Sequence, residues 1–274
     1  MKMKKPYDKA SVKDHWEEKT CGEVYMGTGT DPYEPVRASR YTLIPELPFY
    51  ADFPSARDRD VLEIGVGVGT DFGNWLKHEP KTLTGVDLTD RAVEHTRSHL
   101  ERLGLSMENV SLFRADGEAL PFDDNSFDIV YSWGVLHHSP DTEKAIEEVY
   151  RVLRPGGRSC IMIYHNPSIV GIALWFQYAL FRGRPFQRLR DIYANYLESP
   201  GTKAYSRREA AILFRQFSSV EMHVDLTHGD LLEGDVGQRH QSRLLQVARK
   251  VWPREMLRRF GGALGLNLVV LARK

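Results

Sequence analysis

The stretch that decides the fold is VLEIGVGVGTDFGNWL, residues 61–76. It starts with a run of apolar residues that predicts a buried strand, and this run carries one carboxylate, Glu63. Three alternating glycines follow, Gly65, Gly67 and Gly69, and a helix is expected after them. Glycines at such a turn let the main chain approach a ligand closely, and the helix that follows offers unpaired N–H groups. The stretch therefore predicts a turn that binds a ligand.

Strand and helix patterns alternate from residue 60 to about residue 164. Strands are expected at 60–64, 82–86, 109–113, 127–131 and 158–164, and helices at about 70–77, 89–103 and 141–153. Gly104 follows the second helix and Pro155-Gly156-Gly157 follows the third, as helix stop signals do. This alternation predicts right-handed crossovers and a mainly parallel sheet.

The segments outside this core predict two further layers of structure. Residues 1–57 are expected to form a helical cover, which could close as a lid, and residues 58–274 the α/β domain. Two insertions, at about 166–205 and 227–262, are expected on the face where the strands end. The later part of the chain carries a capping box and two strand patterns, at Ser206 to Glu209, 220–226 and 266–272.

The glycine turn differs from the dinucleotide-binding fingerprint. That fingerprint needs Gly-x-Gly-x-x-Gly, whereas here Thr70 stands at the sixth position. Glu63 would also repel a pyrophosphate, but it suits a cationic ligand. The spacing therefore argues against a dehydrogenase.

Two more carboxylates follow the next two strands. Asp87 ends the second strand, in TGVDL, where a carboxylate can accept both hydroxyl groups of a ribose. Asp116 follows the third strand, in RADGEALPF, where it could accept from an adenine amino group. Each is a weak signal alone, since a turn or a helix cap also favours aspartate, but three carboxylates in order at successive strand ends form a strong pattern.

Four stretches together resemble the class I S-adenosylmethionine-dependent methyltransferases, and most closely the group that includes ubiquinone- and menaquinone-pathway and other small-molecule enzymes. They are VLEIGVGVGT, TGVDL, ADGEALPFDDNSFDIVYSWGVLHH and EVYRVLRPGG. The resemblance is close over about 58–165. It implies a Rossmann-like α/β fold with seven strands, helices on both faces and an antiparallel last strand, and S-adenosylmethionine as cofactor. It assigns cofactor binding to Glu63, Gly65, Val66, Gly67, Gly69, Asp87, Leu88, Asp116, Gly117, Ser132 and Trp133.

The methyl acceptor is expected to meet the N-terminal cover and the insertions. The candidate side chains are Tyr25, Met26, Tyr33, Tyr164 and Trp175. The apolar run IVGIALWFQYALF, 169–181, could pack on the domain, cap an apolar substrate or lie on a membrane surface, but it is too short to span a bilayer. The basic segment 238–260 is expected to be a solvated helix face, with an anionic substrate or lipid surface as the alternative and nucleic acid as a weaker third reading.

A general base is needed only if the acceptor must lose a proton. The histidines that follow strand ends are His137 and His138, after the fourth strand, and His165, after the fifth. A neutral imidazole there could take that proton, and His165 is the first choice, before His138 and His137. A tyrosine, or no base at all, stays possible. No metal site is expected.

Composition narrows the class of protein. Lys and Arg equal Asp and Glu at 37 each, and no RNA-binding motif is present, so a nucleic-acid partner is not expected. Two distant cysteines, Cys21 and Cys160, and the lack of a signal peptide favour the cytoplasm. The expected function is methyl transfer to a small molecule with an apolar portion, such as a natural product, isoprenoid or lipid-like compound. RNA or protein methylation, or a non-catalytic cofactor-binding module, are the alternatives.

Overall fold

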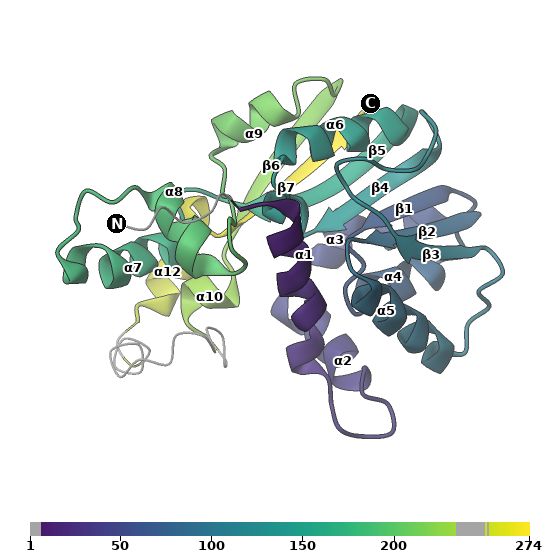
Figure 1. Ribbon diagram of the computed structural model, residues 1–274, viewed down its shortest axis with the longest axis horizontal. Coiled ribbons are helices and arrows are strands. Elements are labelled where there is room, and N and C mark those ends of the chain that lie inside the picture. The colour runs from purple at the N-terminus through teal and green to yellow at the C-terminus, as the bar shows by residue number, and fades with distance from the viewer. Residues whose placement is uncertain (1–6, 234–249, 251) are drawn as a thin grey trace.

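The computed structural model describes residues 7–233, 250 and 252–274. Its centre is a seven-stranded sheet with the strand order β3-β2-β1-β4-β5-β7-β6 (Figure 1). The strands are β1 Asp60–Ile64, β2 Thr82–Asp87, β3 Val110–Arg114, β4 Phe127–Trp133, β5 Leu153–Tyr164, β6 Ser219–Asp225 and β7 Asn267–Arg273. The predicted Rossmann-like fold class is therefore confirmed.

Strand direction follows the expected scheme. The five strands from β1 to β5 pair in parallel, for example Glu63 with Gly85 and with Tyr131. β7 is antiparallel to both of its neighbours, β5 and β6, as predicted for the last strand. All five parallel strands therefore present their carboxyl ends at one edge of the sheet, where open α/β sheets bind ligands.

Helices cover both faces of the sheet because successive strand residues point to opposite sides. Leu62 and Ile64 face one core, which α6 (Thr142–Val152) and α9 (Arg207–Leu213) complete. Val61 faces the other core, built with α3 (Leu47–Ala51), α4 (Thr70–Leu76) and α5 (Asp90–Leu103). The predicted capping box of Ser206 and Glu209 opens α9.

Strand β5 begins earlier than the predicted residue 158. Phe127 pairs with Leu153, whereas Ile129 pairs with Arg158, so residues 154–157 bulge out of the register. Gly156 has a φ of 80° within this bulge. The Pro155-Gly156-Gly157 sequence, which was predicted to follow the end of the third helix, therefore lies in a bulge of strand β5.

The N-terminal residues form a helical cover beside the carboxyl edge of the sheet. It consists of α1 (Lys9–Glu18), the short 3₁₀ turn η1 (Glu23–Tyr25), α2 (Glu34–Leu43), α3 and the 3₁₀ turn η2 (Phe53–Ala56). Figure 1 shows α1 across the ends of the central strands. The helical character of the cover matches the prediction, and its division from the domain at residue 57 stays an interpretation.

The two insertions lie beyond the same edge, on the left of Figure 1. The first holds α7 (Ile169–Tyr178), η4 (Leu180–Arg182), α8 (Leu189–Ile192) and a π-helical turn, η5 (Tyr193–Leu197). The second holds α10 (His228–Leu231), α12 (Arg254–Phe260) and η6 (Gly262–Leu264). Much of the basic segment 238–260 lies outside the described residues. No helix among the described residues is long and apolar enough to cross a membrane.

Candidate active site

A cavity of about 1380 Å³ lies at the carboxyl edge of the sheet. Its walls come from the glycine turn, the ends of β2, β4 and β5, the cover helices α1 and α2, and the insertion helices α7 and α10. Pockets for one small ligand typically measure about 300–1,000 Å³, so this cavity has room for two ligands side by side.

The glycine turn packs closely against two other parts of the chain. Gly65, Gly67 and Gly69 have φ values of 84°, 54° and 76°, a region that side-chain-bearing residues rarely adopt. A Cβ on Gly65 would come within 2.2 Å of Val135, and one on Gly69 within 2.9 Å of Thr96. The turn therefore needs glycine both for its backbone shape and for its packing, and Val66 lines the cavity between these glycines.

Glu63 presents a buried carboxyl group to the cavity. Its Oε2 atom has no hydrogen-bond partner. Burial raises the pKa of Glu63 well above its usual value, and the nearby carboxylate of Asp71 raises it further. A cation bound in the cavity would satisfy this carboxyl group.

Asp71, which sequence reasoning missed, anchors the cover next to Glu63. It accepts two hydrogen bonds from Arg40 of α2, one of them at 3.1 Å, and one from the hydroxyl of Tyr131 at 2.8 Å. The only sequence signal was its place in the first turn of the helix that follows the glycines. Arg40 carries no such local signal, because its role depends on the fold.

Asp87 lies at the end of β2, as predicted, and Leu88 follows it in the cavity wall. The Asp87 carboxylate accepts hydrogen bonds from the Gly67 N–H at 3.3 Å and from the N–H and hydroxyl of Thr89 at 3.0 and 2.9 Å. Burial raises the pKa of Asp87 despite these bonds. The contacts hold the carboxylate beside the glycine turn, where a ligand hydroxyl could reach it.

Asp116 and Gly117 line the same end of the cavity. One oxygen of Asp116 accepts from the N–H of Glu118 at 2.9 Å, and the other pairs with Lys9 of helix α1. Lys9 also pairs with Glu118 at 2.6 Å. The cover is therefore attached by charge to the carboxylate that was predicted to meet adenine.

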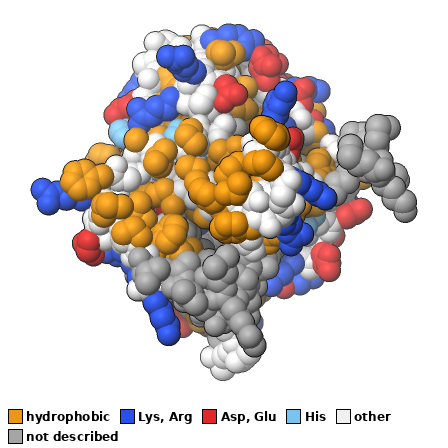
Figure 2. All heavy atoms as spheres, turned by 90° about the vertical axis from the view of Figure 1, so that its left-hand side faces the viewer, with side chains coloured by type: hydrophobic (Ala, Val, Ile, Leu, Met, Phe, Trp, Pro, Cys, Tyr) orange, Lys and Arg blue, Asp and Glu red, His pale blue; other side chains and the backbone are white. Residues whose placement is uncertain are grey.

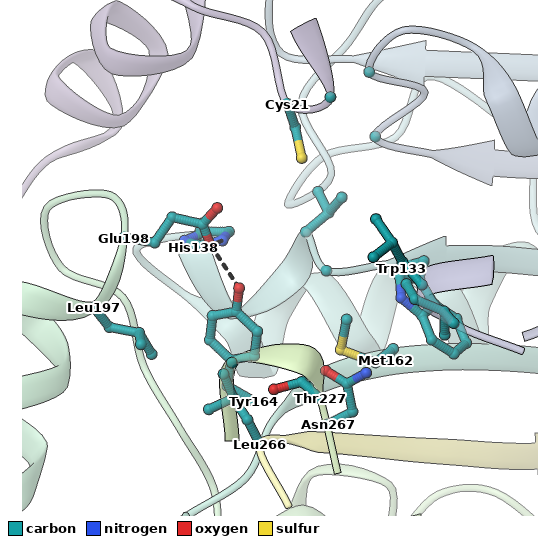
Figure 3. A pocket seen from close by; sticks show the side chains of 18 of the residues that line it. Cys21, Trp133, His138, Met162, Tyr164, Leu197, Glu198, Thr227, Leu266 and Asn267 are labelled. Carbon is teal, nitrogen blue, oxygen red and sulfur yellow. Dashed lines mark hydrogen bonds and ion pairs between the residues drawn. The ribbon is translucent and has the colours of Figure 1, made fainter. Parts of the chain in front are cut away.

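A polar cluster of His138, Tyr164 and Glu198 stands on the other side of the cavity (Figure 3). The Tyr164 hydroxyl donates to Glu198 Oε2 at 2.6 Å, and His138 Nε2 lies 3.4 Å from the same oxygen. On its other side, the His138 Nδ1 lies 2.8 Å from the Ser199 hydroxyl. Sequence reasoning missed Glu198, because it lies in an insertion whose path could not be predicted.

His137 is fully buried behind this cluster. Its ring centroid lies 4.1 Å from that of His138 and 4.0 Å from that of Tyr164, with both pairs of rings tilted, and neither ring nitrogen has a hydrogen-bond partner. Burial lowers its pKa well below the usual value, with His138 and Lys203 adding to the effect, so the ring is neutral. Ligand atoms of His137, His138 and Glu198 lie within 4.8 Å of one another, close enough to hold a metal ion.

His165 and Ser132, like His137, are predicted site residues that do not line the cavity. His165 is buried, with Nδ1 3.1 Å from the carbonyl oxygen of Gly265, and it is not among the lining residues. Ser132 is buried in β4 and donates to the Ile64 carbonyl at 2.8 Å, whereas its neighbour Trp133 lines the cavity. The alternation of side chains along a strand explains why adjacent residues differ.

Of the predicted acceptor contacts, the structure brings Tyr25 and Tyr164 to the cavity. Met26 and Tyr33 lie in a separate apolar cluster, and the Tyr33 ring stacks on His99 at 4.6 Å. Trp175 packs in an apolar cluster with Ile192 and donates to the Gln187 carbonyl at 2.9 Å. These three side chains do not line the cavity.

Comparison with known proteins finds a family that matches the central part of the chain. Residues 62–161 match a family of proteins described as having a methyltransferase domain. This core is a class I methyltransferase domain. A crystal structure of an S-adenosylmethionine-dependent methyltransferase from Mesorhizobium loti shares the fold, with a TM-score of 0.56, 18% identity, and coverage of 84% of this chain and 97% of that one.

Two curated relatives are similar over the methyltransferase domain and its surroundings. The UbiE ubiquinone/menaquinone biosynthesis C-methyltransferase of Psychromonas ingrahamii is 31% identical over 145 residues, which are 52% of this chain and 57% of the relative. The sterol 24-C-methyltransferase of Aspergillus fumigatus is 37% identical over 97 residues, 35% of this chain and 26% of the relative. The matched regions thus span about half or less of these relatives.

S-adenosylmethionine is the cofactor of this type of domain, and the site fits it. The cofactor carries a cationic sulfonium and an ammonium group, and Glu63 offers a buried carboxyl oxygen without a partner. Asp87 and Asp116 line the same cavity as Glu63. The individual roles of these residues remain predictions.

Proposed function

We propose that the protein transfers a methyl group from S-adenosylmethionine to a small molecule with an apolar portion. The observation that supports this most directly is one continuous cavity with two parts. One part is lined by Glu63, Asp87 and Asp116, which we call the cofactor wall, and the other is an apolar chamber. A methyl donor and its acceptor must share one enclosed space, because the transfer is an in-line displacement between them.

The chamber for the acceptor has mostly aliphatic walls. They include Met162, Ile169, Leu174, Leu197, Leu226, Leu231 and Leu266. Polar side chains also line this part of the cavity, and Tyr164, Glu198, Thr227 and Asn267 are labelled in Figure 3. Such a chamber favours a molecule that has a hydrocarbon part and one polar end.

The polar cluster would hold the proton that the acceptor loses. The cofactor supplies the methyl group when it is bound, and the acceptor atom that forms the new bond must give up a proton if it begins as a hydroxyl or an acidic carbon. Glu198 can accept that proton directly, and His138 lies 3.4 Å behind it. The hydrogen bond from Tyr164 fixes the carboxylate in place. We propose this cluster for the base in place of His165, which does not line the cavity.

The comparisons support a small-molecule acceptor. Both curated relatives carry names of C-methyltransferases, one in quinone biosynthesis and one acting on sterols. Their acceptors suggest carbon as the methylated atom here, and a ring with an ionisable hydroxyl would suit the polar cluster. The alternative of an RNA acceptor has less support, since the chain has a net charge of zero.

The test is incubation of the protein with a radiolabelled methyl donor and a cell extract. The extract is separated into organic-soluble small molecules, RNA and protein, and label in each fraction is counted. We expect label in the organic-soluble fraction, and much less of it with the Asp87→Ala variant when the methyl donor is limiting. Label in RNA or protein alone would contradict the proposal, and folded protein that binds no cofactor in titration calorimetry would refute the activity altogether.

A further inference from the structure

Helix α7 has two apolar faces with different surroundings. Val170, Ala173 and Leu174 line the cavity. On the other side, Ile172 and Phe176 are exposed to solvent, one helical turn apart. A helix that is apolar all round is normally buried on all sides. The outward face of α7 therefore requires an explanation.

The exposed apolar surface continues beyond the helix. We define the apolar face as Ile172, Phe176, Leu180, Phe181 and Phe186. Phe181 is 67% exposed and Phe186 is 97% exposed, and the rings of Phe176 and Phe181 lie 6.2 Å apart. Figure 2 looks at this side of the molecule and shows a broad hydrophobic area. Aromatic side chains gathered on a surface mark an interaction site.

Arginines accompany the apolar face. Residues 169–192 contain four of them, all exposed, against one acidic residue, Asp191. They are Arg182, Arg184, Arg188 and Arg190. The Arg182 guanidinium lies 5.2 Å from the centre of the Tyr178 ring, so the positive charge lies directly beside the aromatic surface.

A second segment at the same corner has the same character. Asp230 of α10 accepts from the Val170 N–H of α7 at 3.1 Å and from the Trp252 indole at 2.9 Å, which brings the start of α12 close to α7. On α12, Met256 is 55% exposed and Phe260 is 74% exposed. The guanidinium of Arg259 lies over the Phe260 ring at 5.4 Å.

We infer that this face docks on the surface of an anionic lipid bilayer. Exposed aromatic and aliphatic side chains insert at the boundary between headgroups and acyl chains, and arginines pair with lipid phosphates. The charge pattern favours this occupant over a second copy of the chain. Two copies meeting through this face would bring their arginine clusters together, which costs free energy, whereas an anionic membrane attracts them.

The position of the face deepens the proposed function, on which this step rests. Helix α7 forms the wall between the docking face and the acceptor chamber, with Ile172 outside and Leu174 inside. An acceptor with a long apolar portion dissolves in membranes better than in water. Docking through α7 would place the acceptor chamber beside the membrane in which the acceptor is dissolved.

The test is co-sedimentation of the purified full chain with lipid vesicles. One set contains phosphatidylcholine alone, and the other contains phosphatidylcholine with phosphatidylglycerol. We expect at least about tenfold stronger binding to the anionic set at low salt, since each arginine near such a surface contributes about 1 kcal/mol. The Arg182→Gln/Arg184→Gln variant should lose about thirtyfold in affinity, and Phe181→Ser/Phe186→Ser should lose binding to a similar extent.

Phe49→Ser is the matched control, because Phe49 is 79% exposed on α3, away from this face. It should bind vesicles like the unchanged protein, and circular dichroism should show that all variants are folded. Equal binding by the Phe181→Ser/Phe186→Ser and Phe49→Ser variants, or no preference for anionic vesicles, would overturn the inference. So would a dimer that the double phenylalanine change dissociates. Cofactor titration without vesicles tests the proposed function separately.

Discussion

Arg40 of the N-terminal cover donates two hydrogen bonds to Asp71, the second residue of the helix that follows the glycine turn. The pair lies beside the unpartnered carboxyl oxygen of Glu63. The cover thus contacts the domain directly beside Glu63. The guanidinium of Arg40 lowers the free-energy cost of burying several carboxyl groups close together. The cover and the domain form one binding site, in which each part supplies charge that the other needs.

Removal of the Arg40 side chain should destabilise the fold. Arg40→Ala leaves the buried carboxylate of Asp71 without its cation, and we expect a loss of about 2–3 kcal/mol in the free energy of unfolding, since the pair is only partly exposed. Urea denaturation measures this. Arg57→Ala is the control, because its pair with Glu79 is 69% exposed on both sides and such pairs contribute about 0–1 kcal/mol. Equal effects would show that the Arg40 pair is merely a surface contact.

Cofactor binding should depend on pH through Glu63. The pKa of Glu63 is raised in the empty site, so below that pKa the carboxyl is protonated and must release its proton to hold a cation. Affinity should therefore increase as pH rises, by up to about tenfold per pH unit, and level off above the raised pKa.

Calorimetry in buffers of different ionisation enthalpy measures this proton release. Asp87, whose pKa burial also raises, contributes in the same direction. Glu63→Gln should therefore reduce the slope without removing it. A slope that is unchanged in this variant would exclude Glu63 as the titrating group.

Asp87→Ala should weaken cofactor binding. A carboxylate that loses its hydrogen bonds to a ribose costs about 1.5–3 kcal/mol per bond, or about 10- to 100-fold in the dissociation constant. Asp90→Ala is a suitable control, since Asp90 lies three residues away and pairs with Arg114 on the surface. If both variants bind the cofactor like the unchanged protein, Asp87 is a turn residue only.

The three candidate bases can be separated by turnover. Glu198→Gln and His138→Ala should each lower it by about 10²- to 10⁴-fold while cofactor affinity stays the same. His165→Ala should have a much smaller effect, because His165 does not line the cavity. The reverse order would restore His165 as the base, and small effects in all three would leave positioning and water exclusion as the source of the rate.

Metal removal should leave turnover unchanged. A sulfonium needs no Lewis acid to release its methyl group, although His137, His138 and Glu198 lie close enough to hold an ion. Activity is compared before and after dialysis against a chelator, with metal content measured by mass spectrometry. Activity that falls on dialysis and returns with zinc or manganese would assign a metal to these three residues.

Much of the cofactor wall could be predicted from the sequence because its signals are local. A strand followed by glycines, or by a carboxylate, is written in five to ten consecutive residues, and the parallel arrangement brings the ends of such strands to one edge. Glu63, Asp87 and Asp116 therefore line the cavity as expected. The antiparallel last strand followed from the resemblance in the same way.

The acceptor side depended on contacts between distant segments. Tyr164 and Glu198 meet across 34 positions of the chain, and Arg40 and Asp71 across 31. No local pattern marks such pairs. His165 likewise follows a strand end but lies with its ring against the backbone near Gly265, which depends on how the last strand packs.

The sequence by itself determined the strands of the sheet and the carboxylates that follow their ends. The reason is that the periodicity of hydrophobic residues and the turn residues act over short range. Only the tertiary structure decided which side chains face the acceptor, how the cover is fastened, and which face of α7 remains exposed. Those features depend on the paths of the cover and the insertions, and these paths are set by packing and ion pairs between residues far apart in the chain.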